Sequence, residues 1–273
     1  MPTRLPPLPP LLPALAQLAR EAGARVMAIY ATAFTVLGKA DASPVTLADQ
    51  QAEGVILAGL RRLTPGLAIV AEEDVAAGHV PVLVADEPFW LVDPLDGTRE
   101  FVARNGEFTV NIALIHQGRP LLGVVLAPAV GGPDGTLYAG IDGQGAWVED
   151  GAGRRAIRCR ALPAEGLTVL VSRSHGDAAA QDAFVAGLLA RQLPGQRVAR
   201  TGTSGSSLKL CLIAAGQADL YPRLGRTMEW DIAAGHAVLA AAGGRVTDLS
   251  GAPLRYGKPG FDNPHFVASG LTV

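Results

Sequence analysis

The sequence predicts a mixed α/β fold, and three observations support this class. Apolar residues recur at helical spacing in two stretches of the first sixty residues, with polar residues between them. From residue 107 onward, short apolar runs separated by turn-forming residues are typical of antiparallel hairpins. After residue 166, runs typical of strands alternate with runs typical of helices. We therefore expect N-terminal helices, then an antiparallel sheet, then an alternating α/β half.

Two amphipathic helices are expected near the N-terminus. The first is predicted by apolar residues at helical spacing: Leu11, Leu15, Leu18, Ala22, Val26 and Ile29. It should begin near Pro13, after a proline-rich tail over residues 1–12. In the second, Thr46 can cap the helix and Asp49, three positions on, can close a capping box. This second helix should end near Leu63, where Thr64-Pro65-Gly66 stops it.

Acidic residues follow the first two predicted strands directly. A buried strand over residues 67–71 ends on Glu72-Glu73-Asp74, and a second over residues 89–92 ends on Asp93. Two such strands can bring their carboxylates to one edge of a sheet, where α/β proteins hold ligands. The alternative for the first group is a solvated acidic turn.

The segment Asp93-Pro94-Leu95-Asp96-Gly97-Thr98 places two acids in one bend. Pro94 should prevent the strand from continuing. Gly97 allows the backbone to approach a ligand closely, and the hydroxyl of Thr98 can position a water or begin the next element. Crowded carboxylates repel one another unless a cation lies between them, and such oxygen ligands suit Mg²⁺ held with a phosphate. The segment therefore predicts a magnesium site, with an ordinary Asp-Pro turn as the alternative.

The remaining elements form a hairpin region and an alternating half. Strands are expected over residues 108–115, 121–127, 136–139 and 146–149, with a subdomain boundary at 162–166 that separates residues 13–161 from 162–273. After the boundary we expect strands at 168–171, 196–199, 218–221, 245–247 and 265–268, and helices at 177–193, 202–213 and 229–238. Ser206 and Ser207 at a helix start offer N–H groups to an anion, or act as an ordinary cap. Asp231 lies in a first helical turn, where the helix dipole favours an acid.

Composition limits the kinds of partner. The 273 residues, 49% of them hydrophobic and 18% charged, describe a globular chain that can fill a sizeable core. A net charge of −2 without a run of Lys and Arg argues against a nucleic-acid polymer. Cys159 and Cys211 are far apart and form no CxxC pattern, so we expect reduced core thiols. No apolar stretch reaches the ~18 residues of a membrane span, nor the pattern of a signal peptide, so we expect a cytoplasmic protein.

The acids form an ordered set that resembles the inositol monophosphatase superfamily of lithium-sensitive, magnesium-dependent phosphatases. The set comprises Asp49, Glu72-Glu73, the segment Asp93–Thr98 and Trp230-Asp231. Asp-Pro-Leu-Asp-Gly-Thr and Trp-Asp-Ile-Ala-Ala-Gly resemble the two signature motifs of that superfamily, and the likeness covers nearly the whole chain. It implies a layered α-β-α-β-α sandwich of the inositol monophosphatase and fructose-1,6-bisphosphatase type, with the active site between the halves.

The resemblance also implies roles for individual residues. It implies that more than one Mg²⁺ is bound by Glu72, Asp93, Asp96, Asp231 and the carbonyl of Leu95. Asp49 and Thr98, together with Glu72, would hold the attacking water. Direct attack by this water is implied, rather than a phosphoaspartate intermediate, because a cluster of metal ions supplies the charge neutralisation and the nucleophile.

Outer segments resemble the bacterial 3'(2'),5'-bisphosphate nucleotidases within the superfamily. They comprise Asp93–Val110, Ser172-Arg173-Ser174-His175, Gly205–Lys209 and Leu220-Tyr221-Pro222-Arg223. Such enzymes convert 3'-phosphoadenosine 5'-phosphate to AMP, clearing a by-product of sulfate activation; the sulfated relative is a further expected substrate. The implied substrate contacts are Asp96, Gly97, Thr98, Ser174, His175, Ser206, Ser207, Lys209, Arg223 and Asp231. The sequence departs from this pattern at Arg226 and Glu229.

Alternatives remain open on the sequence. A phosphatase for inositol monophosphate or another sugar phosphate would share every metal ligand and differ only in the outer segments. A catalytically silent protein that binds a phosphorylated metabolite is a further alternative, although crowded carboxylates without a metal would be destabilising. We expect a small phosphorylated nucleotide as partner, a monomer or homodimer, and a cytoplasmic protein with peripheral contact at the inner membrane left open.

Overall fold

The computed structural model describes residues 4–32, 44–172 and 178–271. The helices of this part are α1 (Leu8–Tyr30), α2 (Pro44–Leu63), α3 (Glu72–Ala76), α4 (Thr98–Val102), α5 (Ala178–Gln192), α6 (Leu208–Ala214) and α7 (Glu229–Ala241), with a short 3₁₀ helix at Pro259–Phe261. The first sheet comprises β1 (Ala68–Ala71), β2 (Phe89–Asp96), β3 (Thr109–His116), β4 (Arg119–Ala127), β5 (Thr136–Ile141), β6 (Gly145–Asp150) and β7 (Gly153–Ile157). The second sheet comprises β8 (Leu167–Ser172), β9 (Val198–Ser204), β10 (Leu220–Arg223), β11 (Arg245–Asp248) and β12 (Phe266–Ser269).

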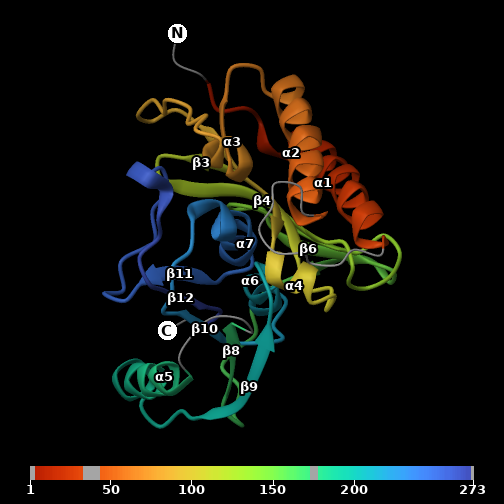
Figure 1. Ribbon diagram of the computed structural model, residues 1–273. Coiled ribbons are helices and arrows are strands. Elements are labelled where there is room, and N and C mark those ends of the chain that lie inside the picture. Colours follow the sequence, from red (N-terminus) through yellow and green to blue (C-terminus); the bar gives the residue numbers. More distant parts are fainter. Residues whose placement is uncertain (1–3, 33–43, 173–177, 272–273) are drawn as a thin grey trace.

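The elements stack in five alternating layers (Figure 1). Helices α1 and α2 cover one face of the first sheet and share a core with it. Helices α6 and α7 lie between the two sheets and pack against both. Helix α5 covers the outer face of the second sheet. The predicted α-β-α-β-α sandwich is therefore confirmed.

The first sheet has strand order β1-β2-β3-β4-β5-β6-β7, with β1 and β2 parallel and the other neighbours antiparallel. The hairpin between β3 and β4 turns at Gln117 and Gly118, which both have positive φ (52° and 70°). Two such residues form the turn whose twist matches that of the flanking strands. Most of β3 and β4 is buried because helices cover both faces of the sheet, which explains their nearly continuous apolar runs.

The second sheet has strand order β11-β12-β10-β8-β9. Strand β8 pairs in parallel with both of its neighbours, β10 and β9, whereas β12 pairs antiparallel with β10 and β11. The expected subdomain boundary at 162–166 falls between the last strand of the first sheet and the first strand of the second. Because α6 and α7 share one apolar core with both sheets, the division into subdomains stays a prediction.

Two helix starts differ from expectation. Helix α1 begins at Leu8 rather than near Pro13, so residues 8–12, expected in a tail, belong to the helix. Prolines in a first turn remove no helical hydrogen bond, and the buried side chains of Leu11 and Leu12 offset the bond lost at Pro13. Helix α2 begins at Pro44 and ends at Leu63 as predicted. Thr46 thus lies inside the first turn, so the expected capping box with Asp49 is wrong.

The start of α6 also differs from expectation. Strand β9 continues to Ser204, so residues 202–204, expected to open a helix, extend the second sheet instead. They pair in parallel with the end of β8, where Leu170 lies opposite Gly202 and Ser172 opposite Ser204. Helix α6 begins only at Leu208. The pairing with β8, which is distant in sequence, explains why the local Gly-Ser pattern was misleading.

In the described part of the chain, no helix is both long and apolar enough to cross a membrane.

Glycines in β4 and β5 allow α7 to lie close to the first sheet. A Cβ placed on Gly123 would lie 2.7 Å from the Cβ of Ala237, and one on Gly140 would lie 2.9 Å from the Cα of Val238. We expect Gly123→Ala to destabilise the protein by about 1–3 kcal/mol because the helix must move away. Thermal unfolding measures this change. Gly54→Ala is the control: a Cβ at that position in α2 meets no atom within 4 Å, so this variant should be slightly more stable.

Candidate active site

Strands β1 and β2 bring two groups of acids to one edge of the first sheet. They pair in parallel with Ala71 opposite Val92, so Glu72 and Asp93 follow at neighbouring strand positions. Glu72 is the first residue of α3, and Asp93 is 1% exposed. The alternative, a solvated acidic turn, is therefore wrong: the acids begin a short helix, and its first residue lies beside Asp93.

Strand β2 does not stop at Pro94, contrary to expectation. It continues to Asp96, but one extra residue lies between the Asp93–Asn111 pair and the Asp96–Thr109 pair. A proline that lacks an N–H is tolerated at such a bulge, which bends the strand and redirects its side chains. The N–H of Leu95 donates to Asp93 Oδ1 at 3.0 Å. The bulge therefore explains how two acids, three positions apart on one strand, reach the same pocket.

Gly97 provides the turn that leads from β2 into α4. Its φ of 97° lies in the left-handed region, and a Cβ there would lie 3.3 Å from the Glu107 carbonyl oxygen and from the Phe108 Cα. Helix α4 then begins at Thr98, which confirms that this residue opens the next element. Thr98 lines the pocket beside Asp96.

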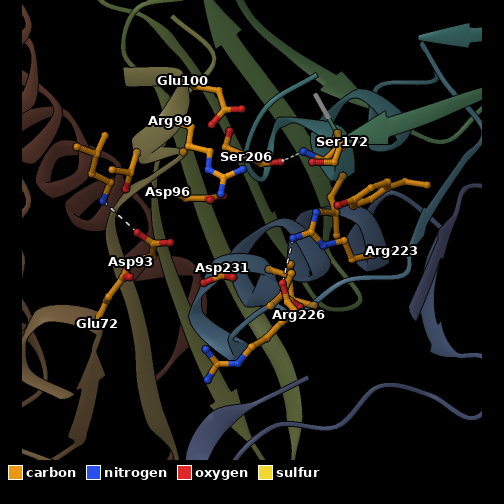
Figure 2. A pocket seen from close by; sticks show the side chains of 18 residues that line it. Glu72, Asp93, Asp96, Arg99, Glu100, Ser172, Ser206, Arg223, Arg226 and Asp231 are labelled. Carbon is orange, nitrogen blue, oxygen red and sulfur yellow. Dashed lines mark hydrogen bonds between the residues drawn. The ribbon is translucent and has the colours of Figure 1, made fainter. Parts of the chain in front are cut away.

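Asp231 reaches the same pocket from the other half of the chain. It lies in the first turn of α7, where its Oδ2 accepts a hydrogen bond from the N–H of Met228 at 2.8 Å. The pocket has a volume of about 300 Å³. Figure 2 shows Glu72, Asp93, Asp96 and Asp231 around it, and Leu95 also lines it. All the predicted carboxylate ligands therefore meet in one place.

The carboxylates perturb one another. Burial raises the pKa of Asp93 well above its usual value, and the charges of Glu72, Asp96 and Asp231 raise it further. Burial likewise raises the pKa of Glu72 to about 7, of Asp96 to about 6 and of Asp231 to about 8. Among the residues that the structure describes, no three His, Cys, Asp or Glu side chains are arranged so that they could hold a metal ion as they stand. Carboxylates that face one another repel, and a hard cation bound by oxygen ligands would relieve this repulsion.

Asp49, on α2, does not line this pocket and is 6% exposed. Burial raises its pKa to about 8, with contributions from Glu73, Glu72 and Glu53. The sequence reasoning missed Glu53, one helical turn after Asp49. Its carboxylate accepts hydrogen bonds from the N–H groups of Glu73 and Asp74, both at 2.9 Å, and so fixes the start of α3 beside Glu72. The signal that could have identified Glu53 is its spacing of four residues from Asp49, which places both side chains on one face of the helix.

Ser207 and Asn111 hold two of the acids in place. Asp96 Oδ2 accepts hydrogen bonds from the Ser207 N–H at 2.7 Å and from Asn111 Nδ2 at 3.5 Å. The Ser207 hydroxyl and Asn111 Nδ2 also donate to the carbonyl of Asp231, at 2.6 Å and 3.3 Å. The expectation that the Ser207 N–H binds substrate is wrong, because Asp96 already accepts from it. The sequence analysis missed Asn111, although a polar residue within an apolar strand is a recognisable signal of a functional or positioning role.

Basic side chains line the same pocket as the carboxylates. Lys209 is 4% exposed, and its ammonium donates to the carbonyls of Ser204 and Ser206 at 3.0 Å and 2.8 Å. Burial lowers the pKa of Lys209 to about 8, although the nearby Asp96 acts in the opposite direction. Lys209 is therefore not a solvated surface residue. Lys209 lines the pocket. Ser206 lines it too and is labelled in Figure 2.

Arg223 is the second basic residue, and its guanidinium is only partly satisfied. The side chain is 8% exposed, and one terminal nitrogen donates to the Arg226 carbonyl at 3.0 Å. Its buried Nε has no hydrogen-bond partner among the described residues, although the residue lines the pocket. A buried unpaired donor is costly and usually indicates a missing partner. Ser174 and His175, the other expected substrate contacts, lie outside the described residues.

The two departures from the nucleotidase pattern have different surroundings. Glu229 is fully buried and pairs with Lys258 Nζ at 2.5 Å, while the N–H of Gly257 also donates to it at 2.7 Å. Glu229 therefore anchors the segment before the 3₁₀ helix. Arg226 lines the pocket but pairs with Asp262 at 2.7 Å through a largely exposed side chain. Only Arg226 is thus positioned to affect a ligand.

The raised carboxyl pKa values predict how stability depends on pH in EDTA. Glu72, Asp49 and Asp231 have ordinary pKa values near 4, raised to about 7 or 8 in the folded protein. Their contribution to stability is complete below pH 4 and is lost as the pH rises through 7 to 8. We expect the unfolding temperature in EDTA to fall between about pH 6.5 and 8.5, and calorimetry measures it. Below pH 6.5 the buried His236 has the opposite effect on stability. Its pKa is lowered to about 3 in the folded protein, so its contribution to stability increases as the pH rises towards 6.5. A flat profile would contradict the prediction.

Relatives with similar sequences include named bacterial enzymes. Residues 8–269 match the inositol monophosphatase family. The chain is 47% identical over 254 residues to the 3'(2'),5'-bisphosphate nucleotidase CysQ of Escherichia coli strain K12, which covers 92% of this chain and 96% of the relative. It is 38% identical over 258 residues to the protein of the same name from Buchnera aphidicola, with 93% and 91% coverage.

Solved structures agree with the sequence comparison. CysQ from Bacteroides thetaiotaomicron, described as a bacterial member of the inositol monophosphatase family, superposes with a TM-score of 0.78 at 35% identity and covers 96% of this chain and 98% of its own. An inositol monophosphatase from Anabaena gives a TM-score of 0.72 at 26% identity, with 96% and 91% coverage. The fold, the two motifs and these matches lead to one conclusion: the chain belongs to the inositol monophosphatase family.

Proposed function

We propose that this protein hydrolyses the 3'-phosphate of 3'-phosphoadenosine 5'-phosphate to give AMP and phosphate, with Mg²⁺ as the required metal. The nucleotidase names of the relatives at 47% identity support the substrate class. The observation that carries the proposal is the division of one pocket into two sides. Glu72 and Asp93 lie at one end of the pocket, Asp96 and Asp231 lie between, and Arg223 lies at the other end (Figure 2). The buried Nε of Arg223 has no partner among the described residues. A bisphosphate needs both a metal site and a second anion site.

The carboxylate side has the donor chemistry for more than one Mg²⁺. The ligands would be the carboxylates of Glu72, Asp93, Asp96 and Asp231 with the carbonyl of Leu95, all from residues that line the pocket. Bound there, the metal would neutralise phosphoryl oxygens and lower the pKa of a water. The mutually raised carboxyl pKa values support this assignment, because a positive charge between the carboxylates would favour their ionised forms.

The chain's own residues would orient the attacking water. We assign this role to Asp49, Glu72 and Thr98. Glu53 holds the start of α3, which fixes the backbone that carries Glu72. Gly97 places Thr98 at the start of α4, on the pocket wall. Because the water attacks phosphorus directly, neither Asp93 nor Asp96 needs to form a covalent bond to the phosphate.

The second phosphate would pair with Arg223. A guanidinium Nε–H that lacks a partner can donate to a phosphate oxygen as a charge-assisted hydrogen bond. Lys209 would act through its charge, since its ammonium already donates to two carbonyls. Ser206, Ser174 and His175 are further proposed contacts. An inositol monophosphate would use the same carboxylates but has no second phosphate for Arg223. Action in the cytoplasm or at the inner membrane surface, as a monomer or homodimer, stays a prediction.

Phosphate release tests the substrate directly. With Mg²⁺ present, 3'-phosphoadenosine 5'-phosphate and inositol 1-phosphate are compared at equal low concentration. We expect at least a tenfold higher rate with the nucleotide, because one extra charge-assisted hydrogen bond contributes about 1.5–3 kcal/mol. A preference for the inositol ester would keep the metal chemistry and overturn the substrate assignment. No release from either ester would favour a binding protein instead.

A further inference from the structure

A second cavity lies farther along α7, past the first turn that carries Asp231. It has a volume of about 840 Å³, within the range of small-molecule sites. Its walls come from the start of β4, from α7, from β11 and from the segment after β11. The lining residues include Arg119, Asp142, His236, Ala240, Arg245 and Arg255. None of them lines the catalytic pocket.

The walls of this cavity carry a surplus of positive charge. Three arginines line it, Arg119, Arg245 and Arg255, against a single carboxylate, that of Asp142. This is an unusual concentration in a protein whose net charge is −2. The arginines come from three separate segments, so the tertiary fold gathers them.

The protein itself satisfies these guanidinium groups poorly. Arg119 lies 3.4 Å from Asp142, and both side chains are largely exposed, so their pairing is weak. Among the described residues, the Arg255 side chain donates only to the Gln117 carbonyl, at 3.4 Å. The backbone of Arg245 pairs with β12, but its side chain makes no hydrogen bond or ion pair with any described residue. The donors therefore remain available to a ligand.

A buried imidazole lies on the α7 side of the cavity. His236 is 7% exposed, and its Nδ1 lies 2.8 Å from the Tyr256 hydroxyl. Burial lowers the pKa of His236 to about 3, with a contribution from the charge of Arg119. The imidazole is therefore neutral at physiological pH. Both His236 and Arg119 line the cavity.

We propose that this cavity binds a small phosphate-bearing molecule at a site distinct from the catalytic pocket. Guanidinium groups match phosphate oxygens with paired hydrogen bonds, and several arginines favour a multiply charged anion. The two sites share α7: Asp231 and Ile232 line the catalytic pocket, whereas His236 and Ala240 line the cavity. A ligand there would contact the helix that carries Asp231, and would do so without competing for the catalytic pocket.

Thermal unfolding in EDTA with pyrophosphate tests this site. EDTA removes divalent cations, so the catalytic carboxylates repel the probe and no turnover occurs. At about ten times its Kd, pyrophosphate should raise the unfolding temperature by roughly 2–5 °C, relative to NaCl at equal ionic strength. The shift should be lost in the double variant Arg119→Gln/Arg245→Gln. It should persist in Arg62→Gln/Arg200→Gln, which removes two exposed arginines elsewhere, and in Arg223→Gln, which alters only the catalytic pocket.

Each other result would overturn the proposal. No shift in the unmodified protein beyond that in NaCl would mean that the cavity does not bind the probe. An unchanged shift in Arg119→Gln/Arg245→Gln would place the probe elsewhere, and loss in Arg223→Gln would place it in the catalytic pocket. Because the replaced arginines of the cavity are exposed, the variants should unfold near the unmodified temperature without ligand. The measurement needs no catalysis, so it is independent of the proposed nucleotidase activity.

Discussion

Asp93→Asn should lower Mg²⁺-dependent turnover of 3'-phosphoadenosine 5'-phosphate by at least about 10³-fold. Metal-ion chemistry contributes several kcal/mol to such reactions, and about 1.4 kcal/mol corresponds to a factor of ten. The same change should raise the unfolding temperature in EDTA near pH 8. It removes a buried carboxylate that faces Glu72, Asp96 and Asp231, and an uncharged amide of similar shape avoids that repulsion. A variant that loses activity but gains stability indicates that Asp93 is a metal-coordinating residue, because replacing a purely structural residue would lower stability.

The control for this variant is Asp134→Asn, which removes an exposed carboxylate outside the pocket. Its turnover and unfolding temperature should match those of the unmodified protein. Normal turnover by Asp93→Asn would show that the magnesium assignment is wrong. A lower unfolding temperature in EDTA would instead show that the Asp93 carboxylate is held by favourable contacts, such as the hydrogen bond from the Leu95 N–H.

Arg223→Gln should selectively impair the bisphosphate. We expect kcat/KM for 3'-phosphoadenosine 5'-phosphate to fall about 10- to 100-fold, since a hydrogen bond to a charged group contributes about 1.5–3 kcal/mol. The value for 3'-AMP, which lacks the second phosphate, should change less than about threefold. Steady-state kinetics with both substrates measure the difference. Glutamine keeps a donor for the Arg226 carbonyl, so the local turn should survive.

Arg226→Gln is the matched control at the same pocket. This guanidinium already pairs with Asp262 and its side chain is largely exposed, so we expect less than about a threefold effect on either substrate. Equal losses for both substrates in Arg223→Gln would indicate a structural role for Arg223. Unchanged kinetics would place the second phosphate elsewhere in the pocket.

Local patterns in the sequence were sufficient to predict the acids and most of the elements. Glu72 and Asp93 follow short apolar runs, and the parallel pairing of β1 with β2 places them together at one sheet edge. The stop signal Thr64-Pro65-Gly66 predicted the end of α2 at Leu63, and the sequence over residues 229–238 predicted α7. The layered arrangement came from the family resemblance, because no local pattern specifies how two sheets stack.

Errors arose where contacts between distant segments decide the outcome. The Ser207 N–H was expected to face substrate, but Asp96, 111 residues earlier, accepts its hydrogen bond. Likewise, Asn111 is recognisable as a positioning residue only because its amide meets Asp96 and the carbonyl of Asp231. Pro94 was expected to end a strand, yet pairing with β3 resumes after the bulge. Propensity alone does not predict such pairings.

The position of α7 between the two sheets has a consequence for synthesis on the ribosome. The seven strands of the first sheet are complete at Ile157, but α7, which covers one face of that sheet, ends only at Ala241. At a translation rate of about 5–20 residues per second, the face stays bare for roughly 4–17 seconds. A nascent chain that exposes so large an apolar surface is a natural client for chaperones. The catalytic pocket is likewise incomplete until α7 delivers Asp231, so an interrupted translation product would lack activity.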